Sequence, residues 1–540
     1  MRNLNTDVAV VGGGAAGCYA ALKLREKGIH PLIICKGWVG KSGASLFAGN
    51  LVVSGRLLGN TAQQAADTAE FLIKYHNQFL IDQNWARSCG QWIEQTYYPE
   101  LEAAGLYFRR DDAGNVVTSP GRIRSIAANV QGNSGVPFMD LRRKQIIKAG
   151  IPHLEETVAT ALLQRGDGSV GGVFALDYLN GEYIVVHAKA VILATGYSDR
   201  LHARSTGTRE MSADGIAMAW RVGAAMSNLE MQWWHTNDVA HPPSWQRMQI
   251  YPNPMLGSEN SARMVNSQGE EFFNQQVDDP LAFGPYTVQL KALTRQVHAG
   301  KARYDGGYFA GFDHCRADEV ETYTTYAKAY KQLGLQFPQE LVETAVTAHY
   351  RQGGVDIDNK TMRTSVAGLY VAGGLGGHSN GLIALATYDG NVVADGVAND
   401  LPTLGNGGIL EQQIDVEHKR LEGILAVQGD LKPVGLKEAL RKVMWDKVGV
   451  EKDNNYEWLD AIDLANMIDA CELIIQASIE RRESRGPFMR RDFPDTDNTH
   501  WLAANIMIKT DNGFRFEQRP YELPFFQPEF ATRNNMDVAW

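Results

Sequence analysis

Residues 6–36, with the sequence TDVAVVGGGAAGCYAALKLREKGIHPLIICK, decide the fold of this chain. An apolar run at 8–11 leads into a glycine-rich turn at 12–17, and a helical pattern then continues up to Gly28. A second apolar run follows at 32–34. Strand, glycine turn, helix and strand in this order form the first unit of a dinucleotide-binding fold. The alternative is a glycine-rich turn in another kind of α/β protein.

Each glycine of the turn has a separate role in such a unit. Gly12 makes the tight turn, Gly14 lets the backbone approach a pyrophosphate, and Gly17 lets the helix pack against the strand. The backbone N–H groups at the start of the helix, around Ala15 and Ala16, favour phosphate oxygens, as does the helix dipole. The stretch therefore predicts a bound dinucleotide.

The end of the second predicted strand departs from the usual pattern. An acidic residue there usually holds the ribose hydroxyls, but this chain has Cys35 followed by Lys36. An NAD-binding enzyme would miss that carboxylate more than some flavoproteins would. The following loop, residues 37–50, is rich in glycine and serine. In a flavoprotein its backbone would be well placed to approach the isoalloxazine ring, whereas the alternative is an ordinary loop.

Composition excludes several classes of protein. The chain has 540 residues and a formal net charge of −10, which argues against nucleic acid or an anionic membrane surface as the main partner. Its five cysteines are scattered, so we expect no iron–sulfur, zinc or other metal site and no disulfide framework within the chain. No apolar run approaches the roughly 18 residues of a membrane span. We expect a cytoplasmic protein with no signal peptide.

The rest of the chain suggests four segments. We expect a first part of a dinucleotide-binding domain at 1–228, an inserted domain at 229–350, a second part of the first domain at 351–404, and a C-terminal helical domain with a tail at 405–540. Within them the patterns predict helices over 61–105 and 139–149 and strands at about 170–177, 182–188 and 188–193. They also predict helices over 410–485 and a helix that begins at Asp214.

The order and spacing of motifs along nearly the whole chain resemble one flavoprotein family. That family comprises succinate dehydrogenase, fumarate reductase, L-aspartate oxidase and the adenylylsulfate reductase α subunit. The motifs that carry the resemblance are the glycine turn, Lys36, Lys41-Ser42, Ala194-Thr195-Gly196, Asp214-Gly215, Leu229-Glu230-Met231 with His235, Met264-Val265-Asn266, Gly353-Gly354, residues 368–373 and Arg482-Glu483-Ser484-Arg485-Gly486.

The resemblance implies an α/β fold with three parts and a bound FAD. The parts are a Rossmann-like FAD-binding domain, an inserted α+β capping domain and a C-terminal helical domain. The residues that it assigns to the cofactor are Gly12, Gly14, Ala15, Ala16, Gly17, Cys35, Lys36, Lys41, Ser42, Gly43, Gly49, Ala194, Thr195, Gly196, Asp214, Gly373, Gly374 and Thr387. Respiratory members attach FAD covalently to a histidine, but this chain has Gly43 in the corresponding place. We therefore expect non-covalent FAD.

The expected substrate site departs further from the family. Tyr286 stands where the family's catalytic arginine would be, and Leu382 stands where a second substrate-binding arginine would be. A phenol does not pair with a carboxylate as a guanidinium does. Arg295, about two helical turns after Tyr286, is a candidate replacement. His235 and His378 fall at positions of substrate-facing histidines, although a lone histidine is more often structural. Succinate, fumarate or aspartate handled in the usual way is therefore not expected.

Electrons must also reach a second redox partner. The chain has no iron–sulfur motif and no second glycine motif that is free for a nicotinamide. The family implies a ferredoxin-like iron–sulfur protein as the electron donor or acceptor, and the leading hypothesis is the flavoprotein subunit of such a complex. Three alternatives remain: an adenylylsulfate-reductase-like α subunit, a free-standing flavin oxidase, and a flavin electron-transfer subunit without a substrate of its own.

Overall fold

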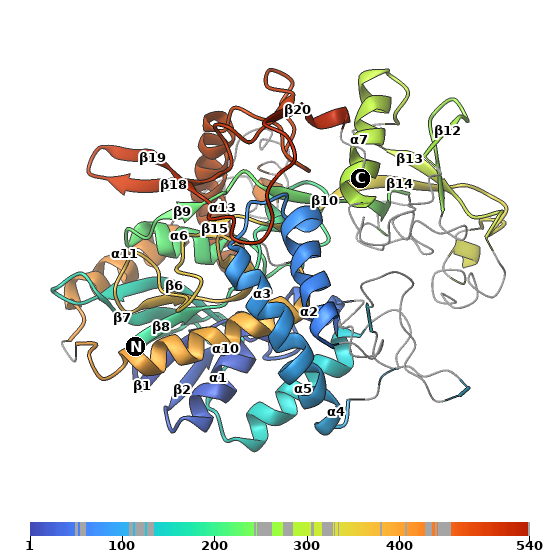
Figure 1. The fold of residues 1–540 in the computed structure, drawn as a ribbon. Coiled ribbons are helices and arrows are strands. Elements are labelled where there is room, and N and C mark those ends of the chain that lie inside the picture. Colours follow the sequence, from blue (N-terminus) through green and yellow to red (C-terminus); the bar gives the residue numbers. More distant parts are fainter. Residues whose placement is uncertain are drawn as a thin grey trace.

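A computed structural model gives the fold (Figure 1). It describes residues 1–48, 52–53, 61–106, 108, 112–113, 125–126, 134–241, 245, 262–273, 285–303, 307–315, 328, 330–332, 334–378, 381–405, 408–426, 435–437, 440 and 455–537.

A seven-stranded sheet forms the centre of the molecule. Its strands follow the order β5-β2-β1-β8-β7-β6, and β16 pairs with β8. They are β1 (Arg2–Val11), β2 (Pro31–Ile34), β5 (His153–Leu154), β6 (Thr157–Gln164), β7 (Val170–Asp177), β8 (Glu182–Leu193) and β16 (Leu369–Val371). β5, β2, β1, β8 and β16 are parallel, whereas β7 and β6 continue the sheet in antiparallel pairs. The predicted strand, glycine turn, helix and strand are confirmed at its centre.

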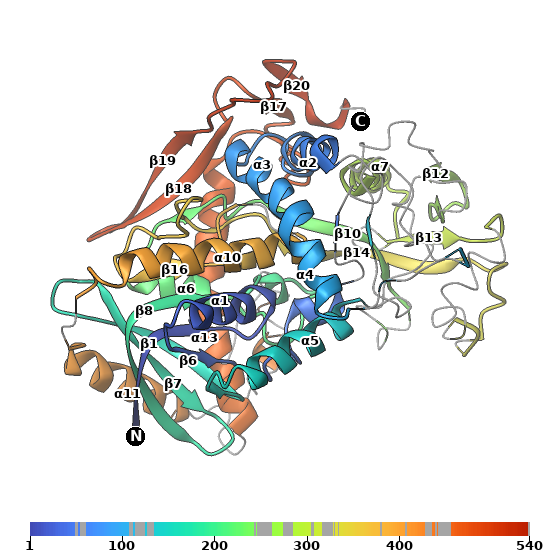
Figure 2. The same ribbon diagram turned by 60° about the horizontal axis from the view of Figure 1, so that its bottom comes forward.

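Helices bury this sheet, which explains the continuous apolar runs of its central strands. α1 (Ala15–Glu26) and α10 (Ile383–Asp400) lie side by side over one face in both ribbon views (Figures 1 and 2). α5 (Gly135–Lys148) packs beside α1, and α6 (Asp214–Arg221) contacts β6. The expectation of two strands between 182 and 193 was wrong. β8 is one strand, because its pairing with β1 continues from Ile184 to Leu193.

The expected helical stretch at 61–105 is confirmed, with a break between two antiparallel arms. It contains α2 (Thr61–Glu70), a π-helical segment η3 (Phe71–His76), α3 (Gln83–Trp92), a second π-helical segment η4 (Ile93–Tyr97) and α4 (Tyr98–Ala103). Asp82 begins the second arm, because its carboxylate accepts hydrogen bonds from the backbone N–H groups of Asn84 and Trp85.

A second sheet lies to the right in Figures 1 and 2 and has its own hydrophobic core. Its order is β10-β14-β13-β11-β12. The strands are β10 (Gln232–Val239), β11 (Arg263–Val265), β12 (Glu271–Phe273), β13 (Tyr308–Gly311) and β14 (Val342–Arg351), and α7 (Pro285–His298) packs on β10. Together they form the expected α+β cap. β10 and β14 pair with each other where the chain leaves and re-enters the first domain.

The C-terminal part begins with helices and ends in strands. α11 (Glu411–Ala426) and α13 (Asn455–Glu480) confirm the expected helices, and α13 packs against α6. The tail also contains β17 (Asp495–Asp497), β18 (Ala503–Thr510), β19 (Gly513–Pro520) and β20 (Thr532–Asn534). β18 joins β9 (Met226–Ser227) in the four-stranded sheet β15-β9-β18-β19, in which β15 is Gly354–Val355. The tail thus packs on the first domain, which the sequence had left open.

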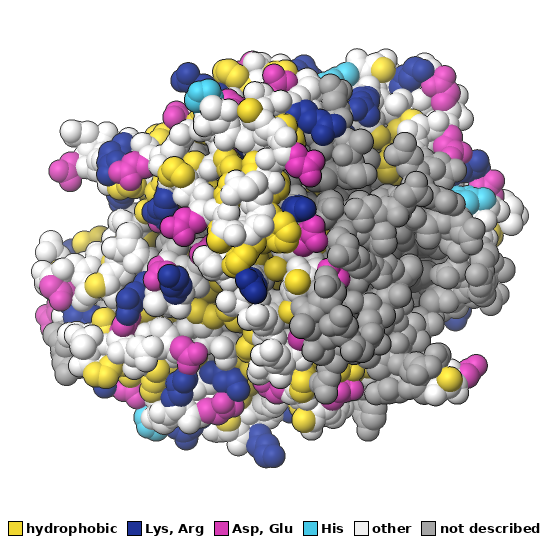
Figure 3. Space-filling model, in the orientation of Figure 1, with side chains coloured by type: hydrophobic (Ala, Val, Ile, Leu, Met, Phe, Trp, Pro, Cys, Tyr) yellow, Lys and Arg dark blue, Asp and Glu magenta, His cyan; other side chains and the backbone are white. Residues whose placement is uncertain are grey.

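The remaining described elements are short. They are η1 (Ala44–Phe47), β3 (Val52–Val53), β4 (Ser125–Ile126), η5 (Asp199–Leu201), η8 (Gly373–Leu375) and η9 (Asn535–Asp537). Among the described helices, none is long and apolar enough to cross a membrane. Acidic and basic side chains are mixed over the described part of the face shown in Figure 3. The segment boundaries at 228, 350 and 404 stay predictions.

Candidate active site

The glycine turn after β1 brings three backbone segments into close contact. Gly12 has φ +119°, and a Cβ atom there would lie 2.2 Å from the carbonyl oxygen of Ala194. A Cβ atom at Gly17 would lie 2.0 Å from the carbonyl oxygen of Gly12. Only glycine allows both approaches, since real Cβ contacts are never this short. The two positions therefore fix where the start of α1 meets the ends of β1 and β8.

α1 begins at the carboxyl end of β1, where an open α/β sheet forms its ligand-binding crevice. Gly14 caps the helix with extended backbone, and the Ala15 N–H donates to the Ser45 hydroxyl at 3.1 Å. Ser45 lies in η1, within the glycine- and serine-rich loop. The loop thus closes over the helix N-terminus, where anions are favoured. Ser45 itself was not predicted from the sequence, although the composition of the loop pointed to it.

Two later glycine turns reach the same crevice. Ala194, Thr195 and Gly196 follow β8, and a Cβ atom at Gly215 would lie 2.1 Å from the Thr195 hydroxyl oxygen. Gly373 follows β16, and a Cβ atom there would lie 2.9 Å from the Cβ atom of Ala16 in the first turn of α1.

The neighbouring Gly374 faces an aromatic ring, because a Cβ atom there would lie 2.4 Å from the ring of Tyr197. Thr387, also assigned to the cofactor, is buried in α10 and donates to the Ile383 carbonyl at 2.8 Å.

The side chains of Lys36 and Asp214 form an ion pair with each other instead of facing a ligand. The Lys36 ammonium lies 2.8 Å from the Asp214 carboxylate and 2.6 Å from the Ser212 hydroxyl, and it also pairs with Asp463 of α13. Burial would lower the pKa of Lys36, but the two carboxylates raise it above its ordinary value. This buried cluster joins the loop after β2 to α6 and α13. The assignment of Lys36 and Asp214 to the cofactor stays a prediction.

The remaining loop residues have local partners. Cys35 is buried, which raises the pKa of its thiol, and its sulfur lies 3.7 Å from the Ser42 hydroxyl. Ser42 also donates to the Trp38 carbonyl at 2.9 Å, and Lys41 pairs with Asp140 of α5. Gly43, with φ +77°, begins η1. Gly49 lies outside the described residues.

His235 on β10 meets a histidine that was not singled out from the sequence. The rings of His235 and His349 lie 3.6 Å apart between centroids, although β10 and β14 are far apart in the sequence. His349 Nδ1 is 2.7 Å from the Thr206 hydroxyl, and burial lowers the pKa of His349 to about 4. His349 therefore offers a neutral imidazole near neutral pH. Its only sequence signal was a His-Tyr dipeptide shortly before the glycines at 353–354.

His378 is held differently. Its Nδ1 lies 2.8 Å from the Asn359 side-chain oxygen, and its Nε2 lies 3.0 Å from the Asp389 carboxylate. Its ring also packs on Trp85, with 4.6 Å between centroids. Asp389 accepts the N–H of Gly373 as well, at 3.0 Å. With both ring nitrogens engaged, His378 is placed to position the turn that carries Gly373, and its catalytic assignment stays a prediction.

The other two candidates, Tyr286 and Arg295, both lie on α7. Tyr286 lies in the first turn of α7, and its side chain is outside the described part of the molecule. Arg295 is on the exposed side of α7, where its guanidinium donates to the carbonyl oxygen of Met536 in the C-terminal tail. Arg295 is therefore occupied at the surface, although its assignment as a replacement catalytic group stays a prediction.

A stack of rings lies between the glycine turns and the cap. His76, Trp233 and Tyr350 stack on one another with 5.2–5.7 Å between centroids, and Tyr197 lies 5.8 Å from Tyr350. The Tyr350 hydroxyl lies 3.0 Å from His76 Nε2, and burial lowers the pKa of His76 to about 4. The His76 ring in the stack is therefore neutral near neutral pH. A Cβ atom at Gly381 would lie 2.7 Å from Tyr350 Cζ and 3.1 Å from His76 Nε2.

Arg351, at the end of β14, is a buried guanidinium with partners in the first domain. Its Nε donates to Ser198 at 3.1 Å, its Nη2 lies 3.3 Å from His202 Nε2, and its Nη1 bonds the Leu229 carbonyl. Burial lowers the pKa of Arg351 to about 10. Gln232 on β10 lies opposite Arg351. The Arg351 side chain therefore links the two strands that lead into and out of the cap to η5 and the residues beside it.

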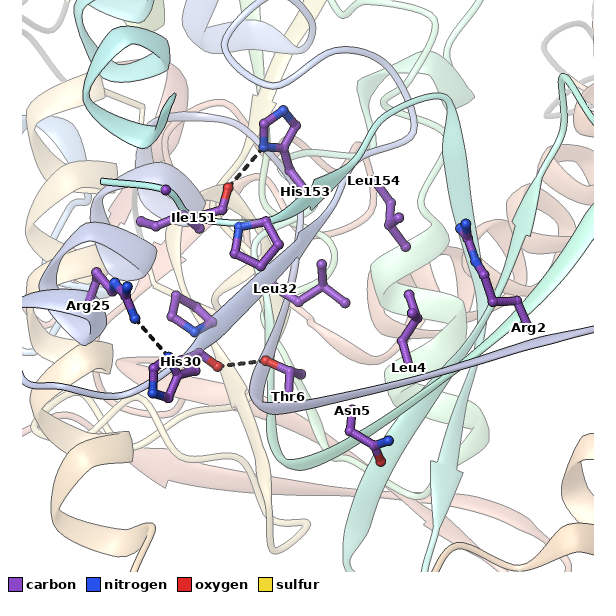
Figure 4. Close-up of a pocket in the computed structure, with 13 residues that line it drawn as sticks. Arg2, Leu4, Asn5, Thr6, Arg25, His30, Leu32, Ile151, His153 and Leu154 are labelled. Carbon is purple, nitrogen blue, oxygen red and sulfur yellow. Dashed lines mark hydrogen bonds between the residues drawn. The ribbon is translucent and has the colours of Figure 1, made fainter. Parts of the chain in front are cut away.

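A separate pocket lies at the opposite ends of the parallel strands (Figure 4). It has a volume of about 390 Å³ and is bordered by Arg2, Leu4, Arg25, His30 and His153, among others. In Figure 4 the Arg25 guanidinium points toward His30, and the two are 2.7 Å apart. This pocket is remote from the crevice at the carboxyl ends, where ligands of such sheets bind.

Comparison with known proteins places the chain in a family. A family model described as an FAD binding domain matches residues 7–387, and one described as the fumarate reductase flavoprotein C-terminus matches residues 436–534. The chain belongs to the succinate dehydrogenase and fumarate reductase flavoprotein family. The flavoprotein is therefore an FAD-dependent oxidoreductase, as the sequence predicted.

Individual relatives are distant but match along most of their length. One subunit of the fumarate reductase (CoM/CoB) of Methanothermobacter marburgensis is 25% identical, covering 93% of this flavoprotein and 96% of the relative. An L-aspartate oxidase of Streptomyces coelicolor is 25% identical, covering 97% of this flavoprotein and 94% of the relative. The FrdA structure of E. coli quinol fumarate reductase superposes with TM-score 0.85 at 18% identity, covering 98% of this flavoprotein and 99% of that chain. The structure of adenylylsulfate reductase from Archaeoglobus fulgidus superposes with TM-score 0.80 at 15% identity, covering 98% of this flavoprotein and 97% of that chain.

The crevice fits FAD. Close backbone approach at Gly12 and Gly17 and the N–H groups that begin α1 suit a pyrophosphate, and the turns at Gly196 and Gly373 bound the same space. FAD, when bound, supplies hydride and single-electron transfer. The chain's own contribution would be to hold the cofactor by the backbone of these turns.

Proposed function

We propose that the flavoprotein exchanges electrons between a small-molecule substrate and an iron–sulfur partner protein, and that the substrate is not a simple C4 dicarboxylate. The substrate would bind where the cap meets the crevice, beside His235 and His349. A neutral imidazole in that pair can donate a hydrogen bond to a substrate oxygen or accept a proton from it. The observation that carries the choice of substrate lies at position 382.

Leu382 caps α10, and its side chain packs against the main hydrophobic core. The residue before it is also surrounded by rings, because a Cβ atom at Gly381 would lie 2.7 Å from Tyr350 Cζ and 3.1 Å from His76 Nε2. An apolar side chain that packs on the core thus stands where the family has that guanidinium. A dicarboxylate site needs cations for both carboxylates, because bidentate arginine contacts supply both charge and orientation.

The nearby Arg351 does not replace the lost guanidinium. All three of its nitrogens have partners in the protein, and it is almost completely buried. Releasing it toward a substrate would leave His202 and the Leu229 carbonyl without this donor, which is costly inside a protein. A planar substrate with fewer than two carboxylates suits neutral imidazoles and aromatic rings better.

An iron–sulfur partner follows from where the electrons can go. The described residues hold no cluster of metal-binding side chains, and the five cysteines are well separated in the sequence. The relative from Methanothermobacter is named as one subunit of its enzyme, which fits a chain that works with other proteins. The competing proposal is direct reoxidation by dioxygen in a free-standing oxidase, which would need no partner.

One reoxidation experiment tests both parts of the proposal. The FAD-loaded full chain is reduced with dithionite without air and mixed in a stopped-flow instrument with an oxidised ferredoxin, air-saturated buffer, fumarate or adenylylsulfate. We expect ferredoxin to reoxidise the flavin at least about tenfold faster than dioxygen, which corresponds to about 1.4 kcal/mol in the barrier. Fumarate should act no faster than buffer.

The other outcomes separate the alternatives. Rapid reoxidation by air with no effect of ferredoxin would favour the free-standing oxidase. Rapid reoxidation by fumarate would show that the arginine-poor site still handles a dicarboxylate, and the proposed substrate class would then be wrong. Rapid reoxidation by adenylylsulfate would favour the adenylylsulfate-reductase-like alternative.

A further inference from the structure

The hairpin β18–β19 leaves one strand edge open. β19 is the last strand of its sheet and, within the described residues, it pairs only with β18. Along it, only Phe514 and Phe516 are half-buried, and the other residues are exposed. Both ribbon views show the hairpin at the margin of the molecule with no described element beyond β19 (Figures 1 and 2). An open edge presents unpaired backbone groups to another strand.

The hydrogen bonds of the neighbouring strand show which residues face this edge. The Asn228 N–H donates to the Asn505 carbonyl at 3.0 Å, so Asn505 of β18 directs its backbone groups toward β9. Gln518 lies opposite Asn505, and in an antiparallel pair such positions alternate with bonded ones. Gln518, Phe516 and Phe514 therefore direct their N–H and C=O groups outward.

We propose that β19 pairs with β19 of a second copy of this chain, in antiparallel orientation and centred on Phe516. In this register Phe516 faces its own counterpart, and Phe514 faces Gln518 of the second copy. All of these positions are outward-facing, so each facing pair can exchange two backbone hydrogen bonds. The two four-stranded sheets would then continue across a twofold axis, which is the usual symmetry of homodimers.

Charge favours this register over a shift of one residue in either direction. Centring on Phe516 places Arg515 opposite Glu517 of the second copy, twice over. Shifting the centre to residue 515 would place Arg515 opposite itself, and shifting it to residue 517 would place Glu517 opposite itself and Arg515 opposite Arg519. Like charges directly opposite each other destabilise a strand pair, and opposite charges stabilise it.

The two charged side chains are available for this contact. Arg515 and Glu517 form an ion pair along β19 and remain 53% and 49% exposed, so neither is committed to a buried partner. Side chains of both signs are visible on the hairpin at the left of Figure 3. An interface of one short strand pair is smaller than the roughly 1,600 Å² of a standard complex, so we expect a weak dimer with Kd on the order of 10–100 µM.

Analytical ultracentrifugation of the FAD-loaded full chain tests the contact. We expect monomer and dimer in equilibrium as the concentration rises to about 300 µM, a few times the upper expected Kd. Arg515→Glu and Glu517→Arg should each weaken association at least about tenfold, because like charges then face each other. The double variant Arg515→Glu/Glu517→Arg should return to within about threefold of the wild type, because complementarity is restored with the signs exchanged.

Two further variants serve as controls. Glu182→Arg makes the same charge change at the exposed Arg2–Glu182 pair on β8 and should leave the dimer unchanged. Gln518→Pro removes an outward N–H that β18 does not use, so it should abolish pairing while circular dichroism and flavin absorption stay the same. A wild type that remains monomeric would overturn the proposal. Single variants that associate normally, or a double variant that does not recover, would do the same.

Discussion

At the scale of single residues, the histidine pair is the centre of the proposed site. His235 comes from β10 and His349 from β14, and Thr206 holds one nitrogen of His349. Burial keeps the pKa of His349 at about 4, so its ring is neutral at physiological pH. Such a ring can bind a substrate oxygen without adding a charge beside the cofactor.

Replacing either histidine should therefore slow turnover without disturbing the cofactor. We expect His235→Gln and His349→Gln each to lower kcat/KM for the substrate that reoxidises the reduced flavin by about 10²–10⁴-fold, the usual contribution of a positioned acid or base. His187→Gln, at a half-buried histidine on β8, is the matched control. Unchanged kcat/KM in both active-site variants would show that the pair only packs.

A second prediction at this scale concerns how FAD is attached. Gly43 offers no nucleophile, and a positive φ of 77° suits glycine there. After precipitation with acid, we expect all flavin absorbance in the supernatant and none with the polypeptide. Flavin fluorescence on the protein band of a denaturing gel would contradict this expectation.

At the scale of elements, the β1–α1 unit depends on contacts too close for any side chain. A Cβ atom at Gly17 would collide with the carbonyl oxygen of Gly12, which is backbone and cannot move aside alone. The turn and the helix N-terminus therefore move together, and the phosphate-facing N–H groups depend on both.

Gly17→Ala should consequently release the cofactor. We expect the purified variant to retain less than about a tenth of the wild-type FAD, since displaced N–H groups lose the geometry that binds phosphate. The matched control is Gly166→Ala, in an exposed turn where a Cβ atom meets nothing within 4 Å. The ratio of flavin absorbance to protein absorbance in the purified variants measures the effect. Full retention of FAD by Gly17→Ala would contradict this account.

At the scale of the whole molecule, buried ion pairs join the C-terminal part to the segment that leads into the cap. Arg481, just after α13, pairs with Glu230 and Glu483, and none of the three side chains is exposed. Arg481 also donates to the side-chain oxygen of Asn228 at 3.1 Å. The C-terminal part is thus held to the segment where the chain enters the cap.

Arg481→Met should destabilise the fold strongly. It leaves two buried carboxylates without this guanidinium, and breaking a buried pair typically costs about 3–5 kcal/mol, the size expected here. Arg2→Met, at the exposed pair with Glu182, should cost less than about 1 kcal/mol. Urea denaturation followed by circular dichroism compares the two. Equal, small losses of stability would show that the buried network is dispensable.

Buried histidines also make stability depend on pH. Burial lowers the folded-state pKa of His76 and His349 from 6.5 to about 4 and that of His202 to about 3. Unfolded histidines bind protons first, so this stability is complete above pH 6.5 and is lost as the pH falls toward 4. Asp199, whose pKa burial raises to about 8, acts in the opposite direction as the pH rises from about 4 to 8.

Removing one of these histidines should weaken the dependence of the unfolding free energy on acidic pH. In His76→Phe the ring stack is kept but the titrating group is lost, so the fall in unfolding free energy between pH 6.5 and 4 should shrink by up to about 3 kcal/mol. Urea midpoints measured across this range, with His187→Phe at a half-buried histidine as the control, provide the comparison. An unchanged slope in His76→Phe would place the acid sensitivity elsewhere.

The sequence by itself determined the cofactor and the family. Gly12, Gly14 and Gly17 act within a few residues of one another, so their spacing encodes the turn directly. The same holds for Asp511-Asn512-Gly513, a local signal for the hairpin turn between β18 and β19. Local conformation of this kind follows from the backbone freedom of single residues.

Only the tertiary structure decided which side chains meet. His349 became a partner of His235 through the register of two strands distant in sequence, and Tyr350 with His76 filled the space beside Gly381. Likewise Lys36, expected at the cofactor, is paired with Asp463 of a late helix. Such contacts depend on packing between elements far apart along the chain, which no local pattern of residues specifies.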